Sequence, residues 1–424
     1  MSHPDRHACD EMRRWTRRGF LRGAASLSAL GALPGVLPRA LQGLAGSGRR
    51  DTLLYVFLRG GLDGLSTVVP YADGDYYAAR PTLAVAPPGQ VDGCLDLDGF
   101  FGLNPTAAAL LPAWSDGRLA FVHASGSTDP TRSHFEAFRK MELGVPNQSL
   151  FSVSEGWMAR HLMATPSDSG GPLRCATLQD IMPLSLAGAP QTLPIADFGN
   201  YELPGDPTTL MNRKATLAAM FGGQAAPVGP AALDALGTFD LLTDFDVDGY
   251  APAHGAVYPD TTFGQAVRQA AAVIKADLGL EVLMVELNGF DHHASQGPVV
   301  GRLADLLDEV SRSLGAFYTD LDTQMDSTLV VVHSEFGRRV AENASDGTDH
   351  GHGGLMMLMG STVLGGQVHG VWPGLSAAAL DQGDLAITTD YRDVLGEVLV
   401  KRLASPDLSA VFPNHTVRAP GVLA

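Results

Sequence analysis

Continuous apolar runs along the chain predict strands that are buried on both faces. These runs span residues 52–58, 119–123, 281–287 and 328–333, with a further candidate at residues 355–359. Apolar side chains at helical spacing predict helices over residues 263–278, 302–325 and 391–403. Because strand and helix alternate from residue 263 to residue 333, we expect an α/β fold with a mainly parallel central sheet and helices on both of its faces.

The segment between the second and third of these strands has a different composition. Residues 145–260 are rich in Pro, Gly, Ser and Asp and contain few long apolar runs. We interpret them as a loop-rich insertion or lid over one edge of the sheet, inside a single domain that spans residues 51–424. No GxGxxG motif follows the first strand and no GxxxxGK(S/T) motif occurs, so neither dinucleotide nor P-loop nucleotide binding is expected.

The N-terminal segment predicts export. Residues 1–50 contain nine Arg and three acidic residues. The pair Arg17-Arg18, followed by Phe-Leu and a short apolar run, is typical of a twin-arginine signal. Small residues at positions 43 and 45, in the pattern Gly43-Leu44-Ala45, predict cleavage, so we expect residues 1–45 to be a signal peptide that the twin-arginine translocase recognises. The mature protein would be periplasmic or secreted, and the alternative is a basic amphipathic surface helix.

Composition and net charge exclude some classes of binding partner. Of the 424 residues, 45% are hydrophobic and 18% charged, which excludes a disordered chain. Residues 51–424 hold 20 basic and 43 acidic residues, a net charge of −23, so no nucleic acid is expected as a partner. No later stretch reaches the ~18 apolar residues of a membrane helix, so the mature form should contain no membrane span. Cys94 and Cys175 would be either bridged in an oxidising compartment or free.

Acidic and imidazole side chains follow the predicted strands. Ligands bind at the carboxyl edge of open α/β sheets, so these side chains are candidates for a site. Asp291 and His293 are two residues apart and would face the same side of an extended segment. The candidate metal ligands are Asp63, Asp291, His293, Glu335, Asp349, His350 and His352. The alternatives are a tight turn around Asp63 and solvent-exposed loop histidines.

This donor set predicts a divalent metal ion as the cofactor. Oxygen and nitrogen donors without a thiolate suit Zn²⁺, Mn²⁺, Fe or Ni better than Cu(I), whereas Ca²⁺ and Mg²⁺ prefer oxygen donors. The sequence leaves the choice among Zn, Mn, Ca and Mg open.

Ser133 is the candidate nucleophile. It stands where a helix is expected to begin, and the helix N-terminus together with Arg132 would stabilise an anion there. The alternative is that Ser133 only caps the helix. His134 would point about 100° away around the helix, so we expect it to act only through another residue.

Motifs spread over nearly all of residues 51–424 resemble a known family. They read Leu58-Arg59-Gly60-Gly61-Leu62-Asp63-Gly64-Leu65, Tyr76-Tyr77, Arg80-Pro81-Thr82-Leu83-Ala84, Arg132-Ser133-His134-Phe135, Asp291-His292-His293, Glu335-Phe336-Gly337-Arg338 and Gly347-Thr348-Asp349-His350-Gly351. The resemblance is to the exported bacterial family catalogued as domain of unknown function 1501, in the alkaline-phosphatase-like superfamily that includes sulfatases. It implies an alkaline-phosphatase-like fold with one or two divalent metals at the carboxyl ends of the parallel strands.

The resemblance also implies roles for individual residues. Asp63 would be the metal carboxylate after the first strand, and Ser133 the nucleophile at a helix start. The remaining ligands would be Asp291 and His293 on one metal, Glu335 in the place of an Asp-His pair, and His350 or His352 as the late imidazole.

Together these features predict a periplasmic metal-dependent hydrolase of phosphate or sulfate esters. Its substrate would be a small anionic ester whose charged oxygens are bound by Arg132, Arg338 or Arg59. The alternative is a non-catalytic binding or assembly protein that retains the fold, because a fold alone does not fix a function.

The export signal can be tested directly. Replacing Arg17 and Arg18 together by Lys keeps the charge but removes the guanidinium pair, so the precursor should accumulate in the cytoplasm. Cell fractionation followed by immunoblotting measures the distribution. Normal export of the double variant would contradict the twin-arginine assignment.

Overall fold

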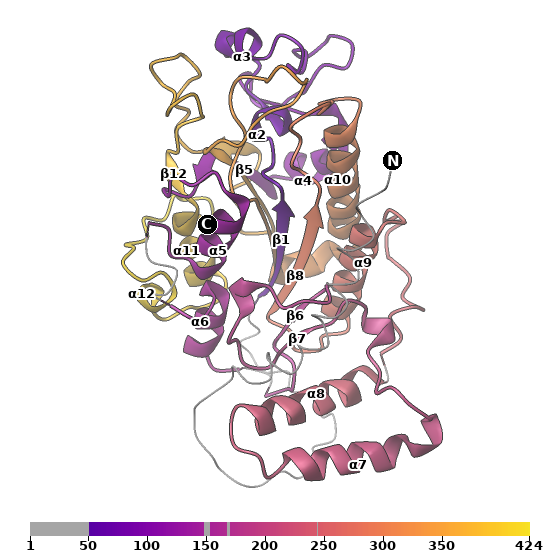
Figure 1. Ribbon diagram of the computed structural model, residues 1–424. Helices are drawn as coiled ribbons and strands as arrows, with labels where there is room; N and C mark the ends of the chain where they lie inside the picture. Colours follow the sequence, from indigo (N-terminus) through magenta and orange to yellow (C-terminus); the bar gives the residue numbers. More distant parts are fainter. Residues whose placement is uncertain (1–50, 148–152, 168–169, 244) are drawn as a thin grey trace, which may run out of the picture.

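A nine-stranded sheet runs through the centre of the computed structural model, which describes residues 51–147, 153–167, 170–243 and 245–424. The expected signal peptide, residues 1–45, lies outside the described residues. The strands of the sheet are β1 (Thr52–Arg59), β5 (Leu119–Gly126), β6 (Cys175–Thr177), β7 (Thr192–Pro194), β8 (Val282–Asn288), β9 (Thr328–His333), β10 (Gly354–Met359), β11 (Gln367–His369) and β12 (Thr389–Asp390). Their order is β11-β5-β10-β9-β1-β8-β6-β7, and β12 pairs with β5 (Figure 1).

Most of the strand pairs are parallel. β1 pairs in parallel with β8 on one side and with β9 on the other. β10, which corresponds to the weaker apolar run at residues 355–359, pairs antiparallel with both β5 and β9. The predicted α/β fold with a mainly parallel sheet is therefore confirmed, and each of the five apolar runs forms a strand.

Helices and short strands complete the described residues. The α-helices are α2 (Gly64–Thr67), α3 (Gly74–Ala79), α4 (Leu111–Ser115), α5 (His134–Leu143), α6 (Trp157–Ala164), α7 (Leu210–Phe221), α8 (Val228–Thr243), α9 (Thr262–Lys275), α10 (Arg302–Leu321), α11 (Tyr391–Lys401) and α12 (Leu408–Val411). The 3₁₀ helices are η1 (Pro105–Leu110), η2 (Leu184–Leu186), η3 (Phe198–Asn200), η4 (Pro207–Thr209) and η5 (Asp322–Ser327). A small antiparallel sheet joins β2 (Val68–Val69), β4 (Gly102–Leu103) and β3 (Leu95–Asp96).

Two local features set the ends of the predicted helices. The helix expected over residues 302–325 ends at Leu321, because Asp322 adopts a φ of 47° and the chain continues as η5. The helix expected over residues 391–403 begins at Tyr391, where the Asp390 carboxylate accepts the backbone N–H of Arg392. This is the N-cap interaction that satisfies a free amide of the first turn.

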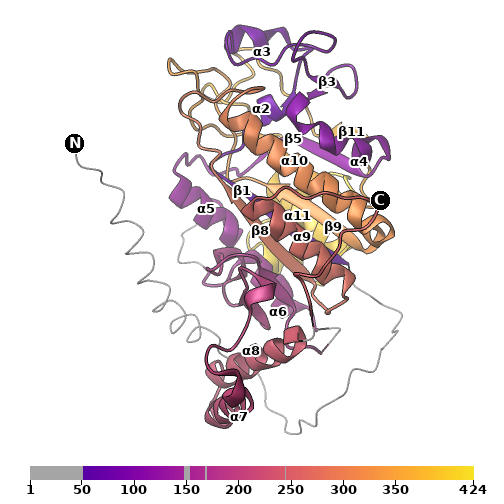
Figure 2. The same cartoon turned by 90° about the vertical axis from the view of Figure 1, so that its right-hand side faces the viewer.

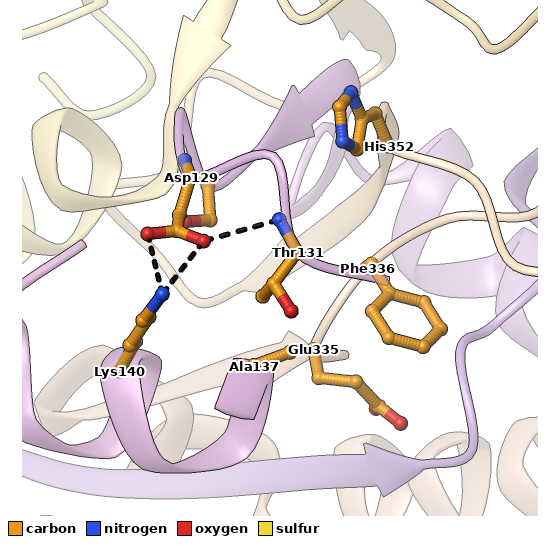
Figure 3. Close-up of a pocket in the computed structure, with 8 residues that line it drawn as sticks. Asp129, Thr131, Ala137, Lys140, Glu335, Phe336 and His352 are labelled. Atoms are coloured by element: carbon orange, nitrogen blue, oxygen red, sulfur yellow. Dashed lines mark hydrogen bonds and ion pairs between the residues drawn. The ribbon is translucent and has the colours of Figure 1, made fainter. Parts of the chain in front are cut away.

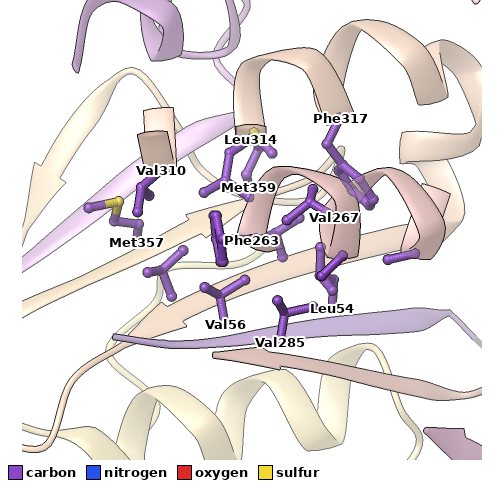
Figure 4. Close-up of a cluster of buried hydrophobic side chains, with 14 of the residues drawn as sticks. Leu54, Val56, Phe263, Val267, Val285, Val310, Leu314, Phe317, Met357 and Met359 are labelled. Atoms are coloured by element: carbon purple, nitrogen blue, oxygen red, sulfur yellow. The ribbon is translucent and has the colours of Figure 1, made fainter. Parts of the chain in front are cut away.

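Helices α9 and α10 cover one face of the sheet (Figure 2). Leu54 and Val56 of β1 point to this face, because successive side chains of a strand point to opposite sides. They share one buried cluster with Val285 of β8, Val267 of α9 and Phe317 of α10 (Figure 4). This cluster fixes the two helices over the centre of the sheet.

The other face is covered by α6, α11 and α12. Leu53 and Tyr55 of β1 point to it, and Tyr55 packs edge-on against Trp157 of α6 at a ring distance of 5.6 Å. Val394 and Leu395 of α11 belong to the same cluster. Helices therefore lie on both faces of the sheet, as predicted.

Residues 145–260 extend one edge of the sheet. They supply β6 and β7, which continue the sheet beyond β8. α7 and α8 lie at the lower end of the molecule in Figure 1, away from the arrowheads that mark the carboxyl ends of β1 and β8. Tyr250 and Tyr258 donate hydrogen bonds to Asp320 of α10, which ties the end of this segment to the domain.

Within the described residues, no helix is both long and apolar enough to cross a membrane. Cys94 and Cys175 are buried and free, so the structure has unbridged thiols.

Asp63 anchors the loop that follows β1. Its Oδ2 accepts hydrogen bonds from Arg80, Gln296 and the Ser66 hydroxyl at 2.6, 2.6 and 2.9 Å. Arg80 is 0% exposed and also donates to the carbonyl oxygen of Val340. Burial alone would raise the pKa of Asp63, but the charge and hydrogen bond of Arg80 outweigh it and lower the pKa. Asp63 is therefore one half of a buried ion pair that joins two loops.

Removing this carboxylate should destabilise the protein. Asp63→Ala leaves the Arg80 guanidinium buried without its partner, which should lower the free energy of unfolding by about 3–5 kcal/mol. Asp308→Ala is the matched control, because it removes an exposed pair with Arg312 and should cost less than about 1 kcal/mol. Urea unfolding measures both values. A cost at Asp63 that disappears when metal is chelated would contradict the ion-pair role and return Asp63 to the metal ligands.

Candidate metal centre

Three loops and a helix start meet beyond the carboxyl end of β1. One ligand atom each from His134 at the start of α5, Asp291 after β8 and His350 before β10 lie within 4.8 Å of one another. His293 joins them, because its Nε2 lies 2.9 Å from Nε2 of His350 and 3.0 Å from Oδ1 of Asp291. We call these four residues the histidine–aspartate cluster.

The outer nitrogen of each imidazole is already engaged. The pairs are His134 Nδ1 with Glu335 Oε1 at 2.7 Å, His293 Nδ1 with Asp349 Oδ1 at 2.9 Å, and His350 Nδ1 with the Arg132 carbonyl oxygen at 2.8 Å. Carboxylate and carbonyl oxygens accept hydrogen bonds, so each Nδ1 carries the proton and donates it. In the neutral imidazole each Nε2 is then left with a lone pair.

These lone pairs converge on Asp291. Nε2 of His134 is buried without a hydrogen-bond partner among the described residues, 3.4 Å from Asp291 Oδ2. Nε2 of His350 lies 3.0 Å from Asp291 Oδ1. The Nε2 lone pairs of His293 and His350, 2.9 Å apart, repel each other unless a proton or a cation lies between them.

The separations fit a shared cation. Two ligands that each lie about 2.1 Å from one tetrahedral ion are about 3.4 Å apart. Three imidazole nitrogens and one carboxylate oxygen are also a donor set that binds Zn²⁺ in proteins. Within the described residues, His134, Asp291 and His350 form one group whose ligand atoms all lie within 4.8 Å of one another, and His293 adjoins this group through its contacts with Asp291 and His350.

Arg338 holds the carboxylate in place. Its Nη2 donates to Asp291 Oδ1 at 2.7 Å, and the residue is 2% exposed. Its other hydrogen bonds go to the carbonyl oxygens of Gly60, Gly61, Phe290 and Thr348. Burial alone would raise the pKa of Asp291, but the hydrogen bond and the positive charge of Arg338 outweigh it and hold the pKa far below its ordinary value.

The pKa values of two imidazoles respond to the same surroundings. Burial alone would lower the pKa of His134, but the carboxylates of Glu335 and Asp291 outweigh it and raise the pKa. Burial is the largest influence on His350, and its pKa is lowered despite the contact with Asp291.

Glycines allow the loops to approach closely. Gly60 has a φ of 117°, and a Cβ there would lie 2.5 Å from the backbone nitrogen of Asp291. A Cβ on Gly337 would lie 1.9 Å from the carbonyl oxygen of Gly353. The loops after β9 and before β10 are bridged by Arg338 and His350 as an antiparallel pair. This pairing sets the position of His350 relative to Asp291.

Glu335 and Asp349 contact the cluster through imidazoles. Glu335 is 0% exposed, and its Oε1 accepts both His134 Nδ1 and the backbone N–H of Gly60, the latter at 2.8 Å. Asp349 accepts His293 Nδ1 in the same way. Carboxylates in this position orient a metal-binding imidazole and raise its basicity. Glu335 and Asp349 were predicted to be metal ligands. In the structure each of them instead contacts a histidine of the cluster, Glu335 through His134 and Asp349 through His293.

His352 and Arg132 lie in neighbouring interactions. Nδ1 of His352 is 3.1 Å from Asp381, and its ring lines a pocket with Thr131 and Lys140 (Figure 3). The Arg132 side chain pairs with Asp384 through Nε at 2.9 Å. Among the predicted ligands, Asp63 and His352 are therefore held by other partners, while Asp291, His293 and His350 come together.

Ser133 is the N-cap residue of α5, as predicted. It is exposed, its φ and ψ are −89° and 120°, and its hydroxyl makes no capping hydrogen bond. The hydroxyl is thus not used by the helix, which removes the observation that would favour a simple capping role.

His134 belongs to the cluster, although the sequence analysis expected it to act only through another residue. The angle of about 100° between successive residues holds inside a helix, but Ser133 is an extended cap and does not follow it. The His134 ring packs against Phe336 and His350 at ring distances of 4.8 and 4.2 Å, which directs it into the cluster. The adjacency of His134 to Ser133 in one motif was the signal available in the sequence.

The solved structures that this chain resembles are distant from it in sequence. A protein in the alkaline phosphatase superfamily from Vibrio parahaemolyticus is 12% identical with a TM-score of 0.35, and the match covers 76% of this chain and 63% of that one. A sulfatase from a Pseudoalteromonas species is 11% identical with a TM-score of 0.40, over 89% of this chain and 72% of that one. A lipoteichoic acid synthase from Listeria monocytogenes is 10% identical with a TM-score of 0.32, over 80% and 74%. Likenesses this distant do not identify a substrate or a metal ion for this chain.

No curated protein matches the sequence. The family described as "Protein of unknown function (DUF1501)" matches residues 208–399, a range that includes Asp291, His293, Glu335, Arg338 and His350. The match covers less than half of the chain and agrees, over that part, with the resemblance seen in the sequence.

Proposed function

We propose that the protein is an exported, metal-dependent hydrolase of phosphate or sulfate esters. The observation that carries the proposal is the convergence of three imidazole Nε2 lone pairs on the Asp291 carboxylate. The exposed hydroxyl of Ser133 belongs to the residue directly before one of these imidazoles.

A divalent cation would be held by Nε2 of His134, His293 and His350 and by Asp291. Nitrogen donors outnumber oxygen in this set, which favours Zn²⁺ or Mn²⁺ over Ca²⁺ and Mg²⁺. When bound, the ion would supply positive charge that polarises an ester oxygen and favours ionisation of a nearby hydroxyl.

Ser133 would provide the nucleophile. Its Oγ would form a bond to phosphorus or sulfur while the bond to the leaving oxygen breaks, and the alcohol would depart with a proton. Water would then cleave the serine ester, so the two steps together add one water across the original ester. The first-turn amides of α5 have no partners within the helix, and they and the helix dipole would stabilise the anionic oxygens of the substrate.

The two arginines would have different roles. Arg132 is partly exposed and stands next to Ser133 in the chain, and its guanidinium would exchange Asp384 for the anionic group of a small ester. Arg338 is buried, and its hydrogen bonds go to four carbonyl oxygens and Asp291. We therefore assign it the positioning of Asp291 instead of substrate binding.

Export by the twin-arginine route is part of the proposal. This route carries proteins that are already folded, which suits a centre assembled from three separate chain segments. The Arg17-Arg18 motif supports it, and the site would then act on small anionic esters outside the cytoplasm.

Substitution of Ser133 tests the mechanism. Ser133→Ala should lower kcat for nitrophenyl phosphate or nitrophenyl sulfate by about 10³-fold or more, because the attacking oxygen is removed. Its metal content should equal that of the parent protein. Assays with added Zn²⁺ or Mn²⁺, paired with elemental analysis, measure both properties.

Ser376→Ala is the matched control, because Ser376 is also an exposed serine but belongs neither to the histidine–aspartate cluster nor to its hydrogen-bond partners, so its loss should leave kcat unchanged. Full activity in Ser133→Ala would contradict the serine nucleophile and indicate direct attack by water. A parent protein that holds metal but hydrolyses no ester of a broad panel would overturn the enzyme proposal in favour of a binding or assembly protein.

A further inference from the structure

One aromatic side chain beside the candidate site is almost completely hydrated. Phe135 is 87% exposed, in the first turn of α5. It follows directly after His134 of the histidine–aspartate cluster and stands two residues after Ser133. Consecutive Cα atoms are about 3.8 Å apart, so the Cα atoms of Ser133 and Phe135 are at most about 7.6 Å apart.

The exposure of Phe135 contrasts with that of Phe138 on the same helix. The Phe138 ring stacks on His134 at 5.8 Å and packs edge-on against Phe57 at 5.9 Å, and the Arg59 guanidinium lies 4.6 Å from its centroid. Phe138 is therefore part of the packing that orients His134. Among the described residues no ring contact of this kind involves Phe135, and its ring is open to solvent.

We propose that Phe135 is a platform for the ring of an aryl ester and selects substrates with an aromatic leaving group. The inference rests on the proposed function, because it takes the anionic end of the ester to lie at Ser133 and the cluster. A phenyl group laid against Phe135 removes apolar surface of both rings from water and adds an aromatic pair contact. The chain thus offers charge at one end of the substrate and an apolar ring at the other.

Binding of non-hydrolysable ligands tests the platform separately from turnover. Phenylphosphonate and benzenesulfonate carry a ring, whereas methylphosphonate and methanesulfonate carry the same anionic groups without one. With the metal-loaded full protein, calorimetry should give tighter binding of the ring-bearing member of each pair. Phe135→Ala should weaken binding of that member by about five- to tenfold and leave the methyl compound unchanged.

Two variants control for other effects. Phe135→Tyr keeps the ring and should retain the preference. Met211→Ala removes another exposed apolar side chain, 76% exposed on α7 away from α5 in Figure 1, and should change neither affinity. The ratio of kcat/KM for phenyl phosphate to kcat/KM for methyl phosphate should also fall in Phe135→Ala.

The outcomes separate the two proposals. Ring-dependent binding that is lost in Phe135→Ala, in a parent protein without turnover, would support the platform and overturn the hydrolase. Equal affinity of the parent protein for the phenyl and methyl compounds would overturn the platform, whatever the activity. Equal weakening of both compounds by Phe135→Ala would also overturn it, because the residue would then act on the site as a whole.

Discussion

The ion pair between Arg338 and Asp291 joins the loops that the candidate site needs. Arg338 also donates to carbonyl oxygens of the loops after β1 and β8, and to Thr348 before β10. A buried guanidinium with these partners fixes where the Asp291 carboxylate lies, since moving it would leave several acceptors and a charge unpaired. The imidazoles are then placed around that carboxylate, each with its proton held on the outer nitrogen. The geometry of the cluster therefore follows from the buried guanidinium of Arg338 and from the orientation of the three imidazole rings.

The fold could be read from the sequence because its signals are local. Apolar runs of five to seven residues marked the strands, and helical spacing marked α9, α10 and α11. The antiparallel direction of β10 has no signature within its own residues, because the direction follows from the path of the loop before it. The short strands β6 and β7 were hidden for a related reason. They have three residues each, too short to produce a pattern, and β7 lies at the edge of the sheet.

Parts of the site were predictable and parts were not. Residue type and spacing singled out Asp291, His293 and His350, which the structure brings together. The partners of a carboxylate were beyond this reasoning, because Arg80, seventeen residues after Asp63, gives no local sign that it will bury against it. The sequence also gives no sign that the carboxylates of Glu335 and Asp349 bind the imidazoles of His134 and His293. Sequence spacing identified the chemical groups, and long-range packing assigned their order around the centre.

The position of a bound metal tests the account most directly. Diffraction from crystals of the protein supplied with Zn²⁺ or Mn²⁺, recorded on both sides of the metal absorption edge, locates the ion by its anomalous signal. The account predicts one peak about 2.0–2.3 Å from Nε2 of His134, His293 and His350 and from the Asp291 carboxylate. Glu335 should remain on His134 Nδ1 and Asp63 on Arg80. A peak at Asp63, or no peak at the cluster after supply of either metal, would contradict the assignment of these four residues as the centre of the site.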